Sequence, residues 1–217
     1  MLDAFSRDGT AERAAAAGAR VESRAWNGFV DARAYALTQV RTPWTLMLDA
    51  DERLDAEARA ALAACDGADA GYTLRRVTML CGRPVRTAGW SSERLLRFFR
   101  TERGRVAGDA VAAGADLHEK WIVDGSCGAL AGTIVHDSYP TLRSYGEKFR
   151  RYTAIEAAAL APSPRALARE VLLAPLRIGW ALLRYGGWRD GWRGLFVAWN
   201  SARYRVVVRA LALRRAS

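Results

Sequence analysis

The chain has 217 residues, of which 51% are hydrophobic and 26% charged, a composition typical of a globular protein with a buried core. This composition excludes collagen-like and low-complexity chains, and no run of about 18 uninterrupted apolar residues predicts a membrane-spanning helix. The net charge of +10 is unevenly spread, because residues 139–217 hold 15 Lys or Arg against 4 Asp or Glu, whereas residues 1–138 hold 18 against 19.

Strands and helices alternate in the first third of the chain, as judged by apolar periodicity and by Gly, Pro and cap residues. Thr10 and Asp55 are the expected N-caps of two of the helices, and Gly18 is expected to end the first. The predicted elements are a strand end and turn at 1–10, a helix at 10–18, a short strand at 19–26, a helix at 29–40, a buried strand at 44–51 and a helix at 55–64.

The middle of the chain predicts further strands, and the end predicts helices. Those elements are a hairpin at 71–85, strands at 94–100 and 128–136, and helices at about 141–160, 165–184 and 190–213. This order predicts an α/β fold with a mostly parallel sheet and a C-terminal helical appendage. We therefore expect two parts, 1–138 and 139–217.

The stretch WTLMLDADERLD at 44–55 ends an apolar strand in a cluster of acids. In open α/β sheets the ligand lies at the carboxyl ends of the strands, so Asp49 and Asp51 are expected on the ligand side. A divalent cation such as Mg²⁺ or Mn²⁺ would relieve the repulsion between them and bridge substrate phosphates. The alternative is an acid-rich helix N-terminus, with Asp55 as cap and Glu52 and Glu57 favouring the helix dipole.

The same stretch resembles the Asp-x-Asp segment of family 2 glycosyltransferases of the GT-A fold, and other stretches extend the resemblance over nearly the whole chain. LDAFSRDGT resembles the turn after the second strand of that fold, and AWNGFVDARAYAL resembles its Trp-x-Gly-Phe helix. AGWSSERLLRFFR, LHE, VHDSYPTLRSYGEKFRRYT and YGGWRDGWRGLFVAWNSARY resemble later blocks. Those later blocks are typical of the branch that glycosylates lipopolysaccharide core or related envelope glycans.

The resemblance implies a set of donor-binding and metal-binding residues. Asp3 matches the aspartate on the nucleobase and ribose side of a nucleotide-sugar donor. Asp49 and Asp51 match the metal and diphosphate motif, and Asp51 is expected to be the direct ligand of Mg²⁺ or Mn²⁺. Arg33 matches an arginine near the donor phosphates, although its neighbours Ala32 and Ala34 replace the family's polar residues.

An inverting sugar transfer needs a base for the acceptor hydroxyl and stabilisation of the departing diphosphate. Glu119 in LHEKW is the candidate base, and His118 is expected to orient it or to bind substrate. His136 is either a third metal ligand or a core histidine. Arg94 and Arg97 are candidates for gripping a phosphate, because a guanidinium pairs with phosphate through two hydrogen bonds.

The resemblance also indicates that the first strand, helix and second strand of the GT-A-like, Rossmann-like fold are missing, because the sequence begins at the end of the second strand. Either the start lies too late or the chain is a degenerate copy. An inactive truncated remnant that only binds a membrane or a partner is therefore the alternative to an active glycosyltransferase. A phosphatase with Asp49 as nucleophile is disfavoured, since the expected Thr and Lys partners are absent nearby.

The C-terminal part interleaves arginine with tryptophan, which suits the headgroup layer of a membrane. We expect a cytoplasmic protein, peripheral at the anionic inner-membrane face, with a glycan or lipid-linked acceptor. The other interpretation is helices that pack on the catalytic domain with arginine outward. Nucleic acid is not an expected partner, because no recognisable binding motif is present. Three cysteines without CxxC spacing fit a reduced compartment.

Overall fold

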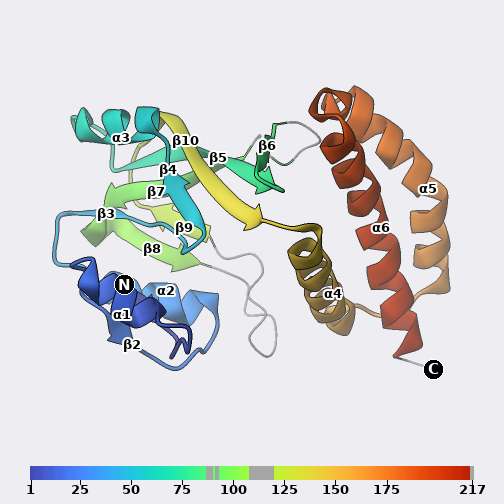
Figure 1. Cartoon of the computed structure of the whole chain (residues 1–217), viewed down its shortest axis with the longest axis horizontal. Helices are drawn as coiled ribbons and strands as arrows, with labels where there is room; N and C mark the ends of the chain where they lie inside the picture. The colour runs from blue at the N-terminus through green and yellow to red at the C-terminus, as the bar shows by residue number, and fades with distance from the viewer. Residues whose placement is uncertain (87–89, 91–92, 108–119, 216–217) are drawn as a thin grey trace. The chain divides into compact units, whose positions relative to one another are not determined.

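The computed structural model describes residues 1–86, 90, 93–107 and 120–215 (Figure 1). The chain forms two compact units, each drawn from separate stretches. Unit 1 comprises 1–47, 67–72 and 96–128, and unit 2 comprises 48–66, 73–95 and 129–217. Unit 2 combines the C-terminal helices with strands from the middle of the chain. The expected division at residue 138 stays a prediction.

Unit 1 contains short strands and two helices. Its elements are β1 (Leu2–Asp3), α1 (Thr10–Ala16), β2 (Glu22–Ser23), α2 (Phe29–Thr38), β3 (Trp44–Leu46), most of β7 (Arg94–Arg100), η1 (Thr101–Arg103), β8 (Gly104–Ala107) and β9 (Lys120–Val123). β1 pairs with β2 in parallel, whereas β3 with β7 and β8 with β9 are antiparallel. Phe99 is fully buried here, and the Phe98 ring stacks on Trp44 with 4.7 Å between ring centroids.

Unit 2 contains the longest strands and helices. Its elements are β4 (Glu52–Leu54), α3 (Ala56–Ala63), most of β5 (Gly71–Leu80), β6 (Arg83–Val85), most of β10 (Cys127–Tyr139), α4 (Leu142–Ala159), α5 (Pro164–Leu183), η2 (Gly187–Asp190) and α6 (Trp192–Arg214). β5 and β6 form the predicted hairpin, turning at Cys81 and Gly82, which both have positive φ as a tight two-residue turn requires.

The largest sheet has the strand order β3-β7-β5-β10-β4, with β6 paired to β5. The α/β class is confirmed, but the sheet is mixed rather than mostly parallel: β3–β7, β5–β6 and β4–β10 are all antiparallel. The physical reason is connection length. β5 and β6 are joined by a tight turn, and such a turn can only return the chain antiparallel.

β10 and the start of α3 approach each other closely at a glycine. Gly132 has φ of +80°, and a Cβ at this position would lie 2.1 Å from the Ala58 nitrogen. The close approach lets Asp55 serve two elements: its carboxylate accepts from Ala58 N at 2.8 Å, as the predicted N-cap of α3, and from Thr133 N at 3.0 Å. This junction fixes the strand that follows the acid cluster.

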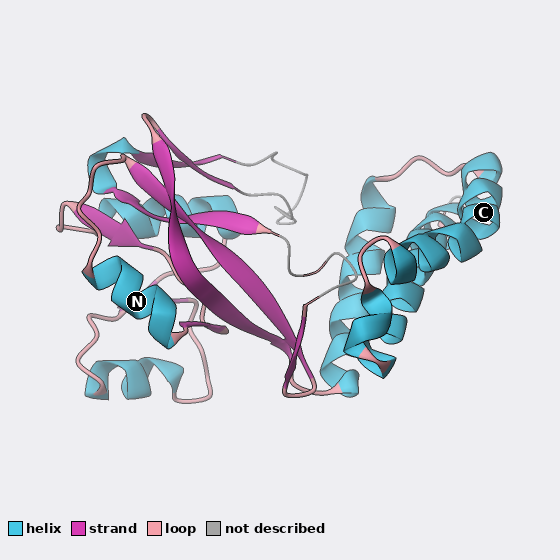
Figure 2. Ribbon diagram, turned by 90° about the horizontal axis from the view of Figure 1, so that it is seen from above, coloured by secondary structure: helices cyan, strands magenta, loops and turns pink. Residues whose placement is uncertain are grey.

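The three C-terminal helices form the predicted helical part (Figure 2), and α6 contacts both α4 and α5. α4 begins with a capping box between Thr141 and Ser144, a feature that satisfies otherwise unpaired backbone groups. The tip of the β5–β6 hairpin packs on α6, where Leu80, Val85 and Val197 form a fully buried cluster. Among the described residues, no helix combines the length and apolar character needed to cross a membrane.

Several local predictions need correction. Gly9, not Thr10, is the N-cap of α1, because Asp8 accepts from both the backbone and the side chain of Thr10. The predicted strand at 44–51 ends at Leu46, and a separate strand, β4, begins at Glu52. The acids of the cluster therefore lie in a turn and on a second strand instead of at the end of one buried strand.

Candidate functional site

Asp49, Ala50 and Asp51 form a tight turn at the start of unit 2. The carbonyl of Asp49 accepts from Glu52 N at 2.9 Å, and Asp49 N donates to the Glu52 carboxylate at 3.1 Å. The carbonyl of Asp51 accepts from Asp137 N at 2.8 Å, which continues the β4–β10 ladder by one step. Asp51 is thereby held beside the end of β10.

The Asp51 carboxylate faces His136, which the sequence analysis left open as either a third metal ligand or a core histidine. Asp51 Oδ2 lies 3.2 Å from His136 Nε2, and the His136 side chain is 18% exposed. Ser138, two residues along β10 and buried, has its Oγ 2.8 Å from His136 Nδ1. Residues two apart in a strand share a face, so β10 presents the imidazole and the hydroxyl to the same side.

A lysine from α4 completes the surroundings of Asp51. Lys148 Nζ lies 3.6 Å from Asp51 Oδ2 and 5.4 Å from the centre of the Tyr139 ring. The hydrogen bond with His136, aided by the positive charges of His136 and Lys148, lowers the pKa of Asp51 to about 2. Asp51 is therefore ionised throughout the physiological pH range, the form in which a carboxylate binds a cation.

The other acids of the cluster have partners of their own. The Glu52 side chain is fully buried and lies 3.8 Å from Arg76 of β5, which also forms a 2.7 Å ion pair with Glu93. Asp55 caps α3 and accepts from Thr133. Each of these acids therefore has its own hydrogen-bond or ion-pair partners within the protein, which offset the repulsion between the carboxylates.

A divalent cation fits this arrangement in part. Asp51 and His136 bring together a carboxylate oxygen and an imidazole nitrogen, a donor set compatible with Mn²⁺, and Mg²⁺ is commonly held by only one or two carboxylates plus substrate phosphates. Within the described ranges, no group of three or more His, Cys, Asp or Glu side chains has the arrangement of a metal site. The protein would therefore supply a partial ligand set, and substrate oxygens and water the rest.

The sequence-predicted Arg94 and the nearby Trp90, both in unit 2, have structural roles. Arg94 donates to the carbonyl of Thr73 at 2.9 Å and to the carbonyl of Leu130 at 2.8 Å. Trp90 packs against Tyr139, with 5.3 Å between ring centroids, and belongs to the core cluster around Leu80. Phosphate binding by Arg94 remains a prediction.

The remaining described candidates lie in unit 1. Asp3 is 5% exposed, and its carboxylate accepts from Ser6 N at 2.9 Å; hydrogen bonds from Ser6 lower the pKa of Asp3. Arg33 on α2 lies over the Phe29 ring at 5.7 Å, and Arg97 on β7 is 3% exposed. Their proposed donor contacts remain predictions.

His118 and Glu119, the predicted acceptor-side pair, lie outside the described residues. Sequence reasoning missed three side chains near Asp51 and Glu52, namely Lys148, Arg76 and Ser138. Lys148 lies in one of the segments that resemble family 2 glycosyltransferases, but a single lysine on a helix does not indicate which residue it contacts. Arg76 and Ser138 lie on strands that contain other polar residues, so the sequence pattern did not single them out.

Comparison with known proteins shows a similarity to a glycosyltransferase. The chain is 27% identical to the lipopolysaccharide core biosynthesis glycosyltransferase LpsC of Rhizobium meliloti (strain 1021), over an alignment of 227 residues that covers 99% of this chain and 82% of the relative. No protein-family model matches the chain. The similarity is to a glycosyltransferase, along nearly the full sequence, and it includes the segment around Asp51 and His136.

Proposed function

We propose that this protein is a glycosyltransferase that moves a sugar from a nucleotide-sugar donor to a lipopolysaccharide-core or other envelope glycan acceptor. The observation that carries the proposal is the similarity to LpsC over 99% of the chain. The pairing of Asp51 with His136 supports it, because a carboxylate beside an imidazole could hold a divalent cation, which would in turn neutralise the donor diphosphate. The family 2 assignment and the GT-A-like fold are part of the proposal.

The chemistry is an inverting transfer. Glu119 removes the proton of the acceptor hydroxyl, whose oxygen attacks the anomeric carbon as the bond to the nucleoside diphosphate breaks. The sugar then carries the new glycosidic bond, and the diphosphate leaves with the bonding electron pair. Lys148 places a positive charge near Asp51 and is available to approach the departing phosphate.

Asp51 and His136, with Asp49 from the same turn, would hold Mg²⁺ or Mn²⁺. When bound there, the cation would neutralise charge on the leaving diphosphate. Asp3, Arg33, Arg94 and Arg97 are the proposed donor-binding residues, and His118 the proposed partner of Glu119. The proposed acceptor is a glycan or lipid-linked molecule, reached from the cytoplasmic side by a protein peripheral at the anionic inner membrane.

The test begins with a thermal-shift screen of sugar nucleotides in Mn²⁺ or Mg²⁺, followed by donor hydrolysis and transfer assays with the stabilising donor. We expect Asp51→Ala to lower turnover about 100-fold or more, because it removes a charge-stabilising group at the leaving diphosphate. Glu119→Gln is expected to lower transfer about 100-fold. The anomeric configuration of the product, measured by NMR, checks inversion.

Glu57→Ala is the matched control, since Glu57 is an exposed acid close in sequence on α3. It is expected to change turnover less than about twofold. Equal rates for wild type and Asp51→Ala would remove the role assigned to Asp51. Absence of donor binding and turnover across the screen would instead favour a protein that acts only as a binding module.

A further inference from the structure

Helix α5 exposes a row of apolar side chains and buries the charged side chain of Glu170. Leu172, Leu176 and Leu183 are 76%, 69% and 80% exposed. In contrast, Glu170 is 3% exposed and forms an ion pair with Arg177. A helix on the surface of a globular protein usually has the opposite polarity, with charges facing water. The outward face of α5 is therefore built to contact something other than water.

The exposed residues form one continuous stripe. At 100° per residue, the positions of the stripe fall within an arc of about 80°, and they extend along about 27 Å of helix. The stripe begins with two exposed arginines and continues with four exposed apolar side chains: Arg165, Arg169, Leu172, Leu176, Trp180 and Leu183. Arg184 follows directly, so arginine flanks the apolar section at both ends.

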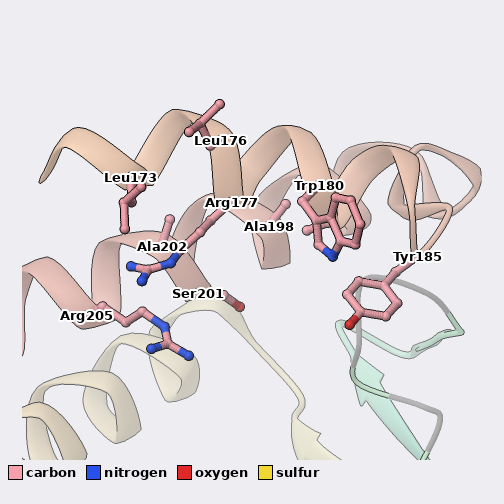
Figure 3. Close-up of a pocket in the computed structure, with 10 residues that line it drawn as sticks. Leu173, Leu176, Arg177, Trp180, Tyr185, Ala198, Ser201, Ala202 and Arg205 are labelled. Carbon is pink, nitrogen blue, oxygen red and sulfur yellow. The ribbon is translucent and has the colours of Figure 1, made fainter. Parts of the chain in front are cut away.

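The stripe continues into a groove between α5 and α6, with a volume of about 470 Å³ (Figure 3). Leu176 and Trp180 belong to both the stripe and the groove. Figure 3 shows the guanidinium groups of Arg177 and Arg205 at one end of the groove, and the rings of Trp180 and Tyr185 at the other. The surface thus offers apolar side chains and tryptophan beside cationic groups.

Positive charge is concentrated at the arginine end. Burial, together with the positive charges of Arg205 and Arg169, lowers the pKa of the Arg177 guanidinium. Glu170 provides the buried negative charge, paired with Arg177 and 3.4 Å from Arg169. An external anion such as a phosphate would relieve the remaining repulsion.

We infer that the α5–α6 surface docks on an anionic lipid bilayer. The section from Leu172 to Leu183 lies in the boundary between headgroups and acyl chains, and Arg169 and Arg205 contact lipid phosphates. The observations that select this occupant are the inverted polarity of α5, its flanking arginines and the excess of 15 basic over 4 acidic residues in 139–217. The inference rests on the membrane location in the proposed function and names the surface that provides it.

The experiment measures sedimentation of the full chain with phosphatidylcholine vesicles, with and without phosphatidylglycerol. We expect stronger binding to the anionic vesicles, weakened by added salt. Leu172→Glu with Leu183→Glu should lower binding at least about tenfold, because it places two charges in the apolar layer. Arg205→Gln should lower binding to anionic vesicles about fivefold and leave binding to neutral vesicles unchanged.

Two control variants change exposed positions on α4 instead of α5. One is Leu142→Glu alone, and the other is Leu142→Glu combined with Glu147→Gln. Both control variants should bind as wild type, and circular dichroism checks that every variant is folded. Single Leu172→Gln provides the same test if the double variant does not fold.

The inference would be overturned by equal binding of wild type to anionic and neutral vesicles, or by binding of the Leu172/Leu183 variant as tight as that of wild type. A wild-type dimer in solution that this variant converts to a monomer would also overturn it, by assigning the stripe to a second copy. Vesicle binding needs no donor or metal, so its failure leaves sugar transfer standing. A failure of sugar transfer likewise leaves the vesicle result standing.

Discussion

Helices α4 and α5 are neighbours in the sequence and follow opposite rules of polarity. On α4 the buried positions recur every fourth residue, at Tyr145, Phe149, Thr153 and Ala157, and arginine and glutamate face outward. On α5 the corresponding apolar stripe is exposed, and Glu170 is the residue that the structure buries.

The difference shows that amphipathic spacing indicates a helix without indicating which face is covered. α4 buries its apolar row in unit 2, whereas α5 leaves the row from Leu172 to Leu183 exposed in addition to the side that contacts α6. The polar side of α4 also supplies Lys148 to Asp51. Truncating an apolar side chain should therefore lower the stability of the protein much more on α4 than on α5.

The largest effect is expected from truncation of the buried face of α4. Phe149 is 7% exposed and contacts Tyr145 and Tyr204, so Phe149→Ala should lower the free energy of unfolding by about 3 kcal/mol. Leu172→Ala on α5 is the matched truncation and should cost less than about 0.5 kcal/mol. Urea unfolding measures both. Similar costs would mean that α5 is covered in the free protein, contrary to the comparison.

An intermediate effect is expected from the ion pair between the buried Glu170 and the partly exposed Arg177 of α5. Glu170→Gln leaves Arg177 without its negative partner, and we expect a loss of about 2 kcal/mol, less than for a fully buried pair because the Arg177 side chain is 32% exposed. Replacing both residues by methionine should recover most of this loss. A double-mutant cycle in urea gives the coupling. A Glu170→Gln variant as stable as wild type would show that the inverted polarity carries no energetic consequence.

The smallest effect is expected at Asp51, where α4 contributes Lys148. The folded-state pKa of about 2 lies below the ordinary 3.8, so the ionised form stabilises the fold above pH 3.8, and this stability is lost as the pH falls toward 2. The Asp51 side chain is 40% exposed, so the contribution stays below about 1 kcal/mol.

Comparison of wild type with Asp51→Asn by thermal unfolding should show a difference at pH 6 that disappears near pH 2. Glu57→Gln should show no such pH dependence. A difference at Asp51 that grows in acid would reverse the sign of the assigned interaction.

The candidate site was predictable where a residue type signals its role locally. The cap by Asp55 follows from a short pattern, and the resemblance singled out Asp51 and left His136 open as a metal ligand or a core histidine. The pairing of Glu52 with Arg76, and of Asp51 with Lys148, was not predictable, because each depends on which strand or helix lies opposite. The sequence analysis expected the acids at the end of one strand, whereas in the structure they lie in a turn, on β4 and at the start of α3.

By itself the sequence determined the helices, the β5–β6 hairpin, the α/β class and the concentration of positive charge after residue 138. These follow from periodicity, caps and turns, which are properties of neighbouring residues. Only the tertiary structure decided the mixed strand directions of the sheet, the position of Lys148 beside Asp51 and the exposure of the α5 stripe. Those features depend on contacts between distant segments, and local sequence preferences do not specify which segments meet.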